Sequence, residues 1–278
     1  MLNFFESRLP GKLVKGITRE DLLDHKAALN ERGLGDRTIY NHIMRIGILL
    51  KTHGVVGLLS AADIPQYEEK EVKAYNPDEL ASMFAAANSE ERMLFEFFLA
   101  TGFREQEVMY STWGNVDFTS KVISVRSKPE MGFRIKDKEE RSVPVPDALI
   151  ASLTARKRES TSMLVFPGTN GKPNGHFLRL LQHLAFRAGL NCRECVNKKG
   201  EGCSNRPVCS EWGLHKFRKT FATMHSDAGV SAPTIQRWLG HSDLATTLRY
   251  LAVADLRSER TRNQVNSTFA ALCVGGAA

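Results

Sequence analysis

The chain has 278 residues, of which 42% are hydrophobic and 25% are charged, so it is long enough for about two domains with buried cores, and wholesale disorder is excluded. Its longest apolar runs, such as 93–100, are too short and too closely flanked by charges to span a bilayer, and its first residues lack the pattern of a secretory signal. We therefore expect a cytoplasmic protein with no membrane partner. The net charge of +7 favours a polyanionic partner such as nucleic acid, because each neutralised phosphate releases a counterion.

The first 66 residues predict a small helical domain. Thr18 is expected to cap a helix over 19–32, and Asp36 is expected to cap a second helix over 37–53. The buried side of the second helix is predicted to consist of Ile39, Ile43, Ile46, Ile48 and Leu50.

The remaining surface of this second helix is polar. It is predicted to carry Arg37, Asn41, His42, Arg45 and Lys51. Such a face is either simply solvated, as on many pairs of packed helices, or it meets the phosphates of DNA. Arg37, Asn41 and Arg45 are the candidate DNA-binding residues, and periodicity alone does not separate the two interpretations.

Residues 67–76 carry many charges and no apolar period, which is the composition of a linker. A larger domain is expected over 77–278. Asn76 is placed to cap its first helix, with Pro77 at the first helical position. The fold class expected for the whole chain is mainly α with a small antiparallel β-sheet (α+β).

A glycine stop follows the apolar helix predicted over 90–100. Arg104 comes just after this stop at Gly102 and near the start of the next helix, where an anion is favoured. Glu107 lies three residues further on and can orient the guanidinium, although an arginine and a glutamate at this spacing more often form a surface ion pair.

Two β-strands are expected next, over 122–125 and 141–145, and helices are expected over 147–158 and 176–189. The long segment between the strands contains Lys128, Lys136 and Lys138. This segment is either a solvated hairpin loop or a means of placing one lysine against a phosphate.

Four of the five cysteines lie close together in the sequence, in a short polar segment over 191–210. They are Cys192, Cys195, Cys203 and Cys209. In a reducing compartment this clustering favours a structural tetrahedral zinc site over disulfides, with an iron–sulfur cluster and unligated cysteines as the alternatives. The segment directly precedes His215, so a metal there is predicted to brace the residues that follow.

Four more polar candidates lie beyond the cysteines. His215 and Arg218 are three residues apart, so on a helix they share a face, and arginine can hold two phosphate oxygens. His241 follows the glycine stop of a later helix, and a further helix leads to Tyr250. Each has a plain structural explanation as a local hydrogen bonder or a helix-edge residue, and 222–240 also resembles a helix-turn-helix that binds DNA without catalysis.

The order and spacing of these motifs resemble the tyrosine recombinase (phage integrase) family. The segment Thr101-Gly102-Phe103-Arg104-x-x-Glu107 resembles the first conserved box of that family. The second conserved box is matched by His215-x-x-Arg218, Leu239-Gly240-His241 and Tyr250. Residues 136–144 resemble the β-hairpin in which the family places a catalytic lysine. The resemblance covers about 74–260. Residues 1–66 resemble, more weakly, the helical core-binding domain of the family.

This resemblance implies a DNA strand transferase that needs no ATP and no catalytic metal. Tyr250 would attack a scissile phosphate of duplex DNA and form a 3′-phosphotyrosine. Arg104 and Arg218 would hold the non-bridging oxygens, with Glu107 supporting Arg104. His215 would act as the base, Lys136 would protonate the leaving oxygen, and His241 would donate a further hydrogen bond.

The chain departs from the family pattern in its short N-terminal domain, its cysteine segment and its long hairpin. In the hairpin, Lys136 fits the spacing best and Lys128 is the alternative. The tail carries an apolar helical stripe with Val265, Phe269, Leu272 and Cys273. It packs on its own domain or, as the resemblance implies, docks on a neighbouring protomer in a homotetramer on DNA. The competing functions are a catalytically inactive DNA-binding regulator and a type IB-like topoisomerase.

Overall fold

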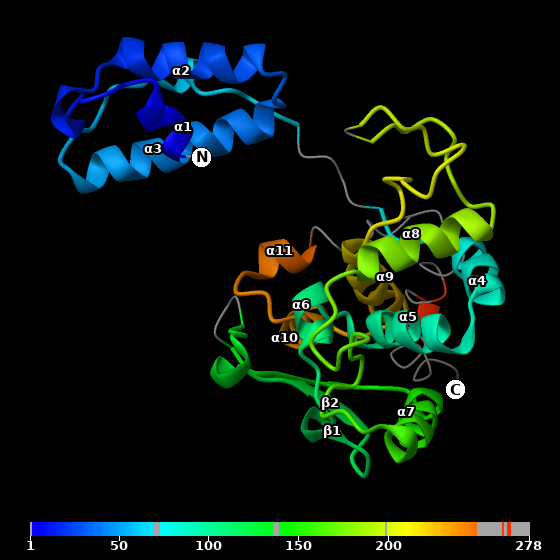
Figure 1. The fold of residues 1–278 in the computed structure, drawn as a ribbon. Helices are drawn as coiled ribbons and strands as arrows, with labels where there is room; N and C mark the ends of the chain where they lie inside the picture. Colours follow the sequence, from blue (N-terminus) through cyan, green and yellow to red (C-terminus); the bar gives the residue numbers. More distant parts are fainter. Residues whose placement is uncertain are drawn as a thin grey trace, which may run out of the picture. The chain divides into compact units, whose positions relative to one another are not determined.

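The computed structural model of the chain describes residues 2–68, 73–135, 139–197 and 199–248, together with residues 263, 266 and 267. The chain divides into two units, Met1–Glu71 and Val72–Ala278 (Figure 1). No helix among the described residues is both long and apolar enough to cross a membrane.

The described part of the N-terminal unit consists of α1 (Leu2–Ser7), α2 (Arg19–Glu31) and α3 (Asp36–Thr52), with 3-10 turns η1 (Val14–Gly16) and η2 (Ala61–Asp63). Thr18 caps α2 as predicted, because its hydroxyl accepts a hydrogen bond from the Asp21 amide while the Asp21 carboxylate accepts one from the Thr18 amide. Leu22 of α2 packs with Ile46 of α3 in a small apolar cluster, so the two long helices share one core.

Three details of α3 differ from the prediction. Gly35 is the N-cap, and Asp36 lies in the first helical turn. Ile48 is 62% exposed, because it lies about 200° around the helix from the buried Ile46. His42 is buried, at 9% exposure, since it falls within the stripe of buried isoleucines, and its ring faces His25 at 5.9 Å between centroids.

The larger unit is built from helices around a small sheet. Its described helices are α4 (Pro77–Ala86), α5 (Ser89–Thr101), α6 (Glu105–Met109), α7 (Asp147–Glu159), α8 (Phe177–Arg187), α9 (Leu214–Asp227), α10 (Ala232–Leu239) and α11 (Leu244–Leu248), with 3-10 turns η3 (Trp113–Asn115) and η4 (Pro129–Met131). As predicted, Asn76 caps α4 and Pro77 occupies its first turn.

The sheet has three antiparallel strands in the order β1 (Val116–Asp117), β2 (Val122–Val125) and β3 (Arg141–Pro144). Ile123 pairs with Val143 in its centre, and both side chains are fully buried. The two longer strands were predicted, whereas the two-residue β1 was not. The predicted fold class, mainly α with a small antiparallel sheet, is confirmed.

Aromatic side chains hold α5 against α9 in the centre of the larger unit. Phe217 of α9 stacks on Phe95 at 5.7 Å between ring centroids and on Phe98 at 6.0 Å, and all three rings are 0% exposed. The pair of helices is therefore a rigid base. Arg104 follows the end of α5, and His215 and Arg218 lie on the first two turns of α9.

Tyr75 lies within the segment that the sequence predicted to be a linker, yet it is only 3% exposed and packs into the core of the larger unit. Its ring stacks on Trp212 at 4.8 Å. Tyr75 is buried although its neighbours in the sequence are charged, so the average composition of the segment did not predict its burial.

Candidate active site and cysteine cluster

A glycine with a left-handed backbone ends α5 and begins the site. Gly102 has φ +61°, and a Cβ at this position would lie 2.9 Å from both Phe221 and Leu239. A side chain is therefore excluded by backbone conformation and by space together. The close approach brings the Gly102 carbonyl oxygen to Arg218, whose Nη1 donates to it at 2.8 Å.

Arg218 connects three elements that are far apart in the sequence. Its side chain comes from α9 and is 1% exposed. Nη1 donates to the Gly102 carbonyl at the end of α5, and Nη2 donates to the Leu239 carbonyl at the end of α10. Carbonyl dipoles satisfy hydrogen bonds but do not cancel a full charge, and the charge of Arg218 also helps to lower the pKa of the Glu107 carboxyl.

A second close approach fixes Arg141 beside α10. Gly240 has φ +63°, and a Cβ there would lie 2.9 Å from Cδ of Arg141. With glycine in place, Nε of Arg141 donates to the Trp238 carbonyl at 2.7 Å. Arg141 thereby ties strand β3 to the residues just before His241. The sequence predicted Arg141 as the start of a strand but not as part of this cluster.

The Glu107 carboxylate lies between two arginines. Arg141 contacts both of its oxygens, at 3.1 and 2.6 Å, and Arg104 donates to Oε1 through Nη1 at 3.1 Å. The Arg104 amide also donates to Oε2, at 2.8 Å, at the N-cap of α6. Burial raises the pKa of the Glu107 carboxyl, but the attraction of Arg141 outweighs it, so this pKa lies below its usual value. Glu107 is therefore ionised and orients Arg104, whose side chain stays 23% exposed.

His241 lies beside these arginines as a neutral imidazole. It is 7% exposed, and its Nδ1 is 2.9 Å from the hydroxyl of Thr247. Burial, together with the positive charges of Arg218 and Arg104, lowers its pKa to about 3. A neutral imidazole has one N–H to donate, so His241 offers a hydrogen bond rather than a charge.

His215 lies in the first turn of α9 and is exposed, in contrast to Arg218 one turn later. It is near enough to His241 to affect the pKa of that residue electrostatically, as Arg104, Arg141 and Arg218 also do. The structure thus brings together the candidates from the first and second motifs around His241. Three guanidinium groups lie around a single carboxylate, so the charges here would attract an anion.

Two of the sequence-predicted candidates, Lys136 and Tyr250, lie outside the described residues, as do Lys138 and the tail residues Val265, Phe269, Leu272 and Cys273. Lys128 is described. It is 8% exposed, its ammonium lies 3.5 Å from the Arg126 carbonyl, and burial lowers the pKa of its amine.

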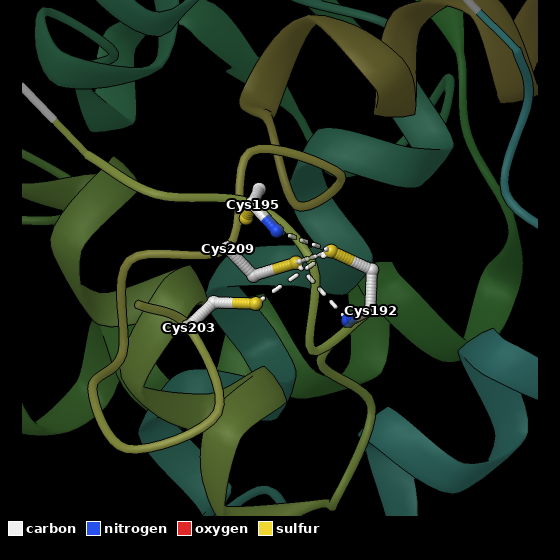
Figure 2. Close-up of side chains that lie close together, drawn as sticks. All are labelled: Cys192, Cys195, Cys203 and Cys209. Carbon is white, nitrogen blue, oxygen red and sulfur yellow. Dashed lines mark hydrogen bonds between the residues drawn. The ribbon is translucent and has the colours of Figure 1, made fainter. Parts of the chain in front are cut away.

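The four cysteines of the 191–210 segment form one cluster, and their sulfurs all lie within 4.8 Å of one another (Figure 2). Cys203 and Cys209 are fully buried. Backbone amides donate to the sulfurs of the cluster, from Cys195 to Cys192 at 3.4 Å and from Ser210 to Cys195 at 3.2 Å. Such N–H···S contacts favour the thiolate form, and the amides of Glu194 and Cys195 lower the pKa of the Cys192 thiol to about 6. This group of side chains can hold a metal ion.

Comparison with known proteins matches residues 73–257 to the family model described as the phage integrase family. Tyrosine recombinase XerD of Pseudomonas aeruginosa is 25% identical over 273 residues, which cover 89% of this chain and 81% of that protein. A tyrosine recombinase of Thermosipho africanus is 24% identical, over 88% of this chain and 83% of that protein.

Two solved structures have a similar fold. The Tn1549 transposon integrase in complex with circular intermediate DNA superposes with a TM-score of 0.69 and 18% identity, over 95% of this chain and 90% of that one. A lambda integrase dimer bound to a COC′ core site gives a TM-score of 0.63 and 15% identity, over 90% of this chain and 84% of that one.

We expect Arg141→Met to lower the free energy of unfolding of the larger unit by about 3–5 kcal/mol, because it removes the main partner of a buried carboxylate. Urea denaturation followed by tryptophan fluorescence measures this, since all three tryptophans lie in that unit. Arg92→Met is the matched control, because it breaks the exposed pair with Glu96 and should cost less than about 1 kcal/mol. Equal losses in the two variants would show that the Arg141–Glu107 pair does not stabilise the site.

Proposed function

The chain belongs to the phage integrase family, and on this premise we propose that it is a site-specific tyrosine recombinase that cleaves and rejoins duplex DNA through a 3′-phosphotyrosine intermediate. The observation that carries the proposal is the meeting of three distant motifs at Arg218, which binds the carbonyls of Gly102 and Leu239. Three guanidinium groups, those of Arg104, Arg141 and Arg218, lie around the single Glu107 carboxylate there, and this excess of positive charge suits a phosphodiester in the DNA backbone.

In the proposed reaction the Tyr250 hydroxyl attacks the scissile phosphorus. The bond from phosphorus to the 5′ oxygen breaks and leaves a free 5′-hydroxyl. A 5′-hydroxyl later attacks the 3′-phosphotyrosine, which re-forms a phosphodiester and releases the tyrosine. The energy of the phosphodiester is retained in the covalent link, so strand exchange needs no ATP. Because the hydroxyl of a free tyrosine has a pKa of about 10, its proton must pass to a base, and we assign that role to the exposed His215.

Arg104 and Arg218 hold the non-bridging oxygens in this mechanism. The charge on those oxygens grows as phosphorus becomes pentacoordinate, so fixed guanidinium groups stabilise the transition state more than the ground state. Glu107 fixes Arg104 by two hydrogen bonds, and its single charge balances only one of the three nearby guanidinium groups. His241 adds a neutral donor, which its depressed pKa supports.

Lys136 is the proposed acid that protonates the 5′ oxygen as it leaves, with Lys128 as the alternative in the same hairpin. The burial of Lys128 lowers the pKa of its amine, which would ease proton donation. A substrate whose leaving oxygen is replaced by sulfur needs no acid. It should therefore restore cleavage to a variant of the true acid but not to a variant of the other lysine.

We expect Tyr250→Phe to abolish the covalent adduct with a suicide DNA substrate, because it removes the nucleophilic oxygen. Denaturing electrophoresis measures the adduct. Tyr110→Phe is the matched control, since its ring stacks on Phe133 at 4.9 Å and should stay in place without the hydroxyl.

An adduct that persists in Tyr250→Phe would identify a different nucleophile. No adduct in the unmodified protein would favour a DNA-binding regulator, and an adduct without strand exchange between two duplexes would favour a type IB-like topoisomerase.

A structural zinc ion is the proposed occupant of the cysteine cluster. Four sulfurs within 4.8 Å suit a tetrahedral site in which protein fills every position. The described part of the loop has a β-bridge between Val196 and Gly202 and hydrogen bonds such as that from the Asn191 side chain to the Cys203 carbonyl at 2.6 Å, but it carries few apolar side chains of its own. A metal is therefore a natural means of fixing it. An iron–sulfur cluster is the alternative ligand for the same thiolates.

We expect purified protein to contain about one zinc per chain and no visible absorption band. Cys203→Ser should lose the metal, because its sulfur is fully buried in the cluster. Cys273→Ser, which alters the remaining cysteine, should keep it. Metal-free protein under reducing conditions, or a Cys203→Ser variant that retains zinc, would contradict this assignment.

The N-terminal unit is proposed to bind duplex DNA in the cytoplasm through Arg37, Asn41 and Arg45. These three residues are exposed and recur every four positions along α3, so they form one stripe. The tail stripe with Val265 and Phe269 is proposed to link four protomers around two duplexes.

One assembly experiment tests both of these assignments. Arg45→Ala should weaken DNA binding and reduce its salt dependence, because one phosphate contact is lost, whereas Lys15→Ala, outside the stripe, should not. Deletion of 262–278 should leave binding to one duplex intact but prevent pairing of two duplexes, as measured by gel mobility and light scattering. Unchanged pairing would contradict the role of the tail.

A further inference from the structure

Tyr75 holds the residue at which α9 begins. The N-cap residue of α9 is Gly213, which has no side chain to accept a hydrogen bond from the helix. The Tyr75 hydroxyl accepts a hydrogen bond from the Gly213 amide at 3.1 Å and donates to the Gly213 carbonyl at 2.9 Å. The Tyr75 amide donates to the hydroxyl of Thr220 at 2.8 Å. One residue at the start of the larger unit therefore holds two points of the helix that carries His215.

Trp212 connects the same place to the cysteine cluster. Its ring lies against Tyr75 at 4.8 Å with an interplanar angle of 22°, and it is 2% exposed. The Trp212 amide donates to the carbonyl of Cys209 at 3.3 Å, and its indole N–H donates to the carbonyl of Leu190 at 2.9 Å. These two carbonyls lie at the two ends of the cysteine loop, so the position of the indole depends on the loop being closed.

A continuous path thus runs from the cysteines to the site. Cys209 holds Trp212, Trp212 stacks on Tyr75, and Tyr75 holds Gly213. His215 follows only two residues later, in the first turn of α9. Because His215 lies in that first turn, the direction of the turn decides where its side chain begins.

We propose that Tyr75 and Trp212 are positioning residues for His215, and that they make its placement dependent on a closed, metal-bound cysteine loop. The inference rests on the proposed function insofar as His215 acts in DNA cleavage. It explains why an aromatic residue in an otherwise charged segment is buried, and why a cysteine loop lies directly before α9.

The test is a double-mutant cycle with Tyr75→Phe, which removes the hydroxyl and keeps the stacked ring. Cleavage of a suicide substrate under single-turnover conditions should slow about 10-fold in the otherwise unmodified protein and less than about 2-fold in a His215→Ala background, because Tyr75 acts through His215. A Tyr75→Phe effect of the same size in both backgrounds would overturn the proposal.

Hydrogen exchange provides a readout that does not depend on activity. In Tyr75→Phe, amide exchange over 213–217 should quicken about 5- to 10-fold while exchange in α5 stays the same and the zinc content is unchanged. Removal of zinc from the unmodified protein should quicken exchange over the same residues. Unchanged exchange over 213–217 in either experiment would overturn the proposal, even if no covalent adduct were ever formed.

Trp113→Phe is the matched control for Trp212→Phe, because the indole N–H of Trp113 also donates to a carbonyl in the same unit, that of Ser162 at 3.1 Å. Only Trp212→Phe should quicken exchange over 213–217 and slow cleavage. Equal effects of the two variants would indicate general loosening of the unit and would overturn the proposal. Normal cleavage by His215→Ala would instead count against the proposed role of His215, while the exchange results still decide whether Tyr75 and Trp212 fix the helix.

Discussion

The hydrogen bonds from Arg218 to the carbonyls of Gly102 and Leu239 are the interaction on which the candidate site of the larger unit depends. A guanidinium that is 1% exposed is costly to bury, and neutral carbonyls recover only part of the lost hydration. Arg104 and Arg141 lie beside the same carboxylate, Glu107, so positive charge exceeds negative charge at this point of the larger unit. A phosphate of bound DNA would balance this excess.

Local signals in the sequence were sufficient for most of this architecture. The caps at Thr18 and Asn76, the glycine stop at Gly102 and the apolar period of the central helices each act within a few residues, and the corresponding helices formed where they were expected. The family resemblance supplied the order of the candidate site residues, and the structure brings the described members together around His241.

What the sequence did not predict depends on contacts between distant residues. Arg141 resembled an ordinary strand residue until Glu107 and the Trp238 carbonyl were found beside it. Tyr75 is surrounded by charged neighbours in the sequence, and only the fold reveals its aromatic partners. Ile48 is exposed and His42 is buried, the reverse of what was expected, because with a 100° step between residues His42 lies on the buried stripe of α3 and Ile48 lies off it.

Glu107, Arg141 and Gly240 together restrict how this site can diverge in evolution. A Cβ at Gly240 would lie 2.9 Å from Cδ of Arg141. Replacement of Arg141 would leave the buried Glu107 carboxylate without its main partner. Neither neighbour can therefore be replaced alone without loss. A different arrangement would need matched changes on a strand, a helix and a turn, because the three residues lie on β3, on α6 and just after α10.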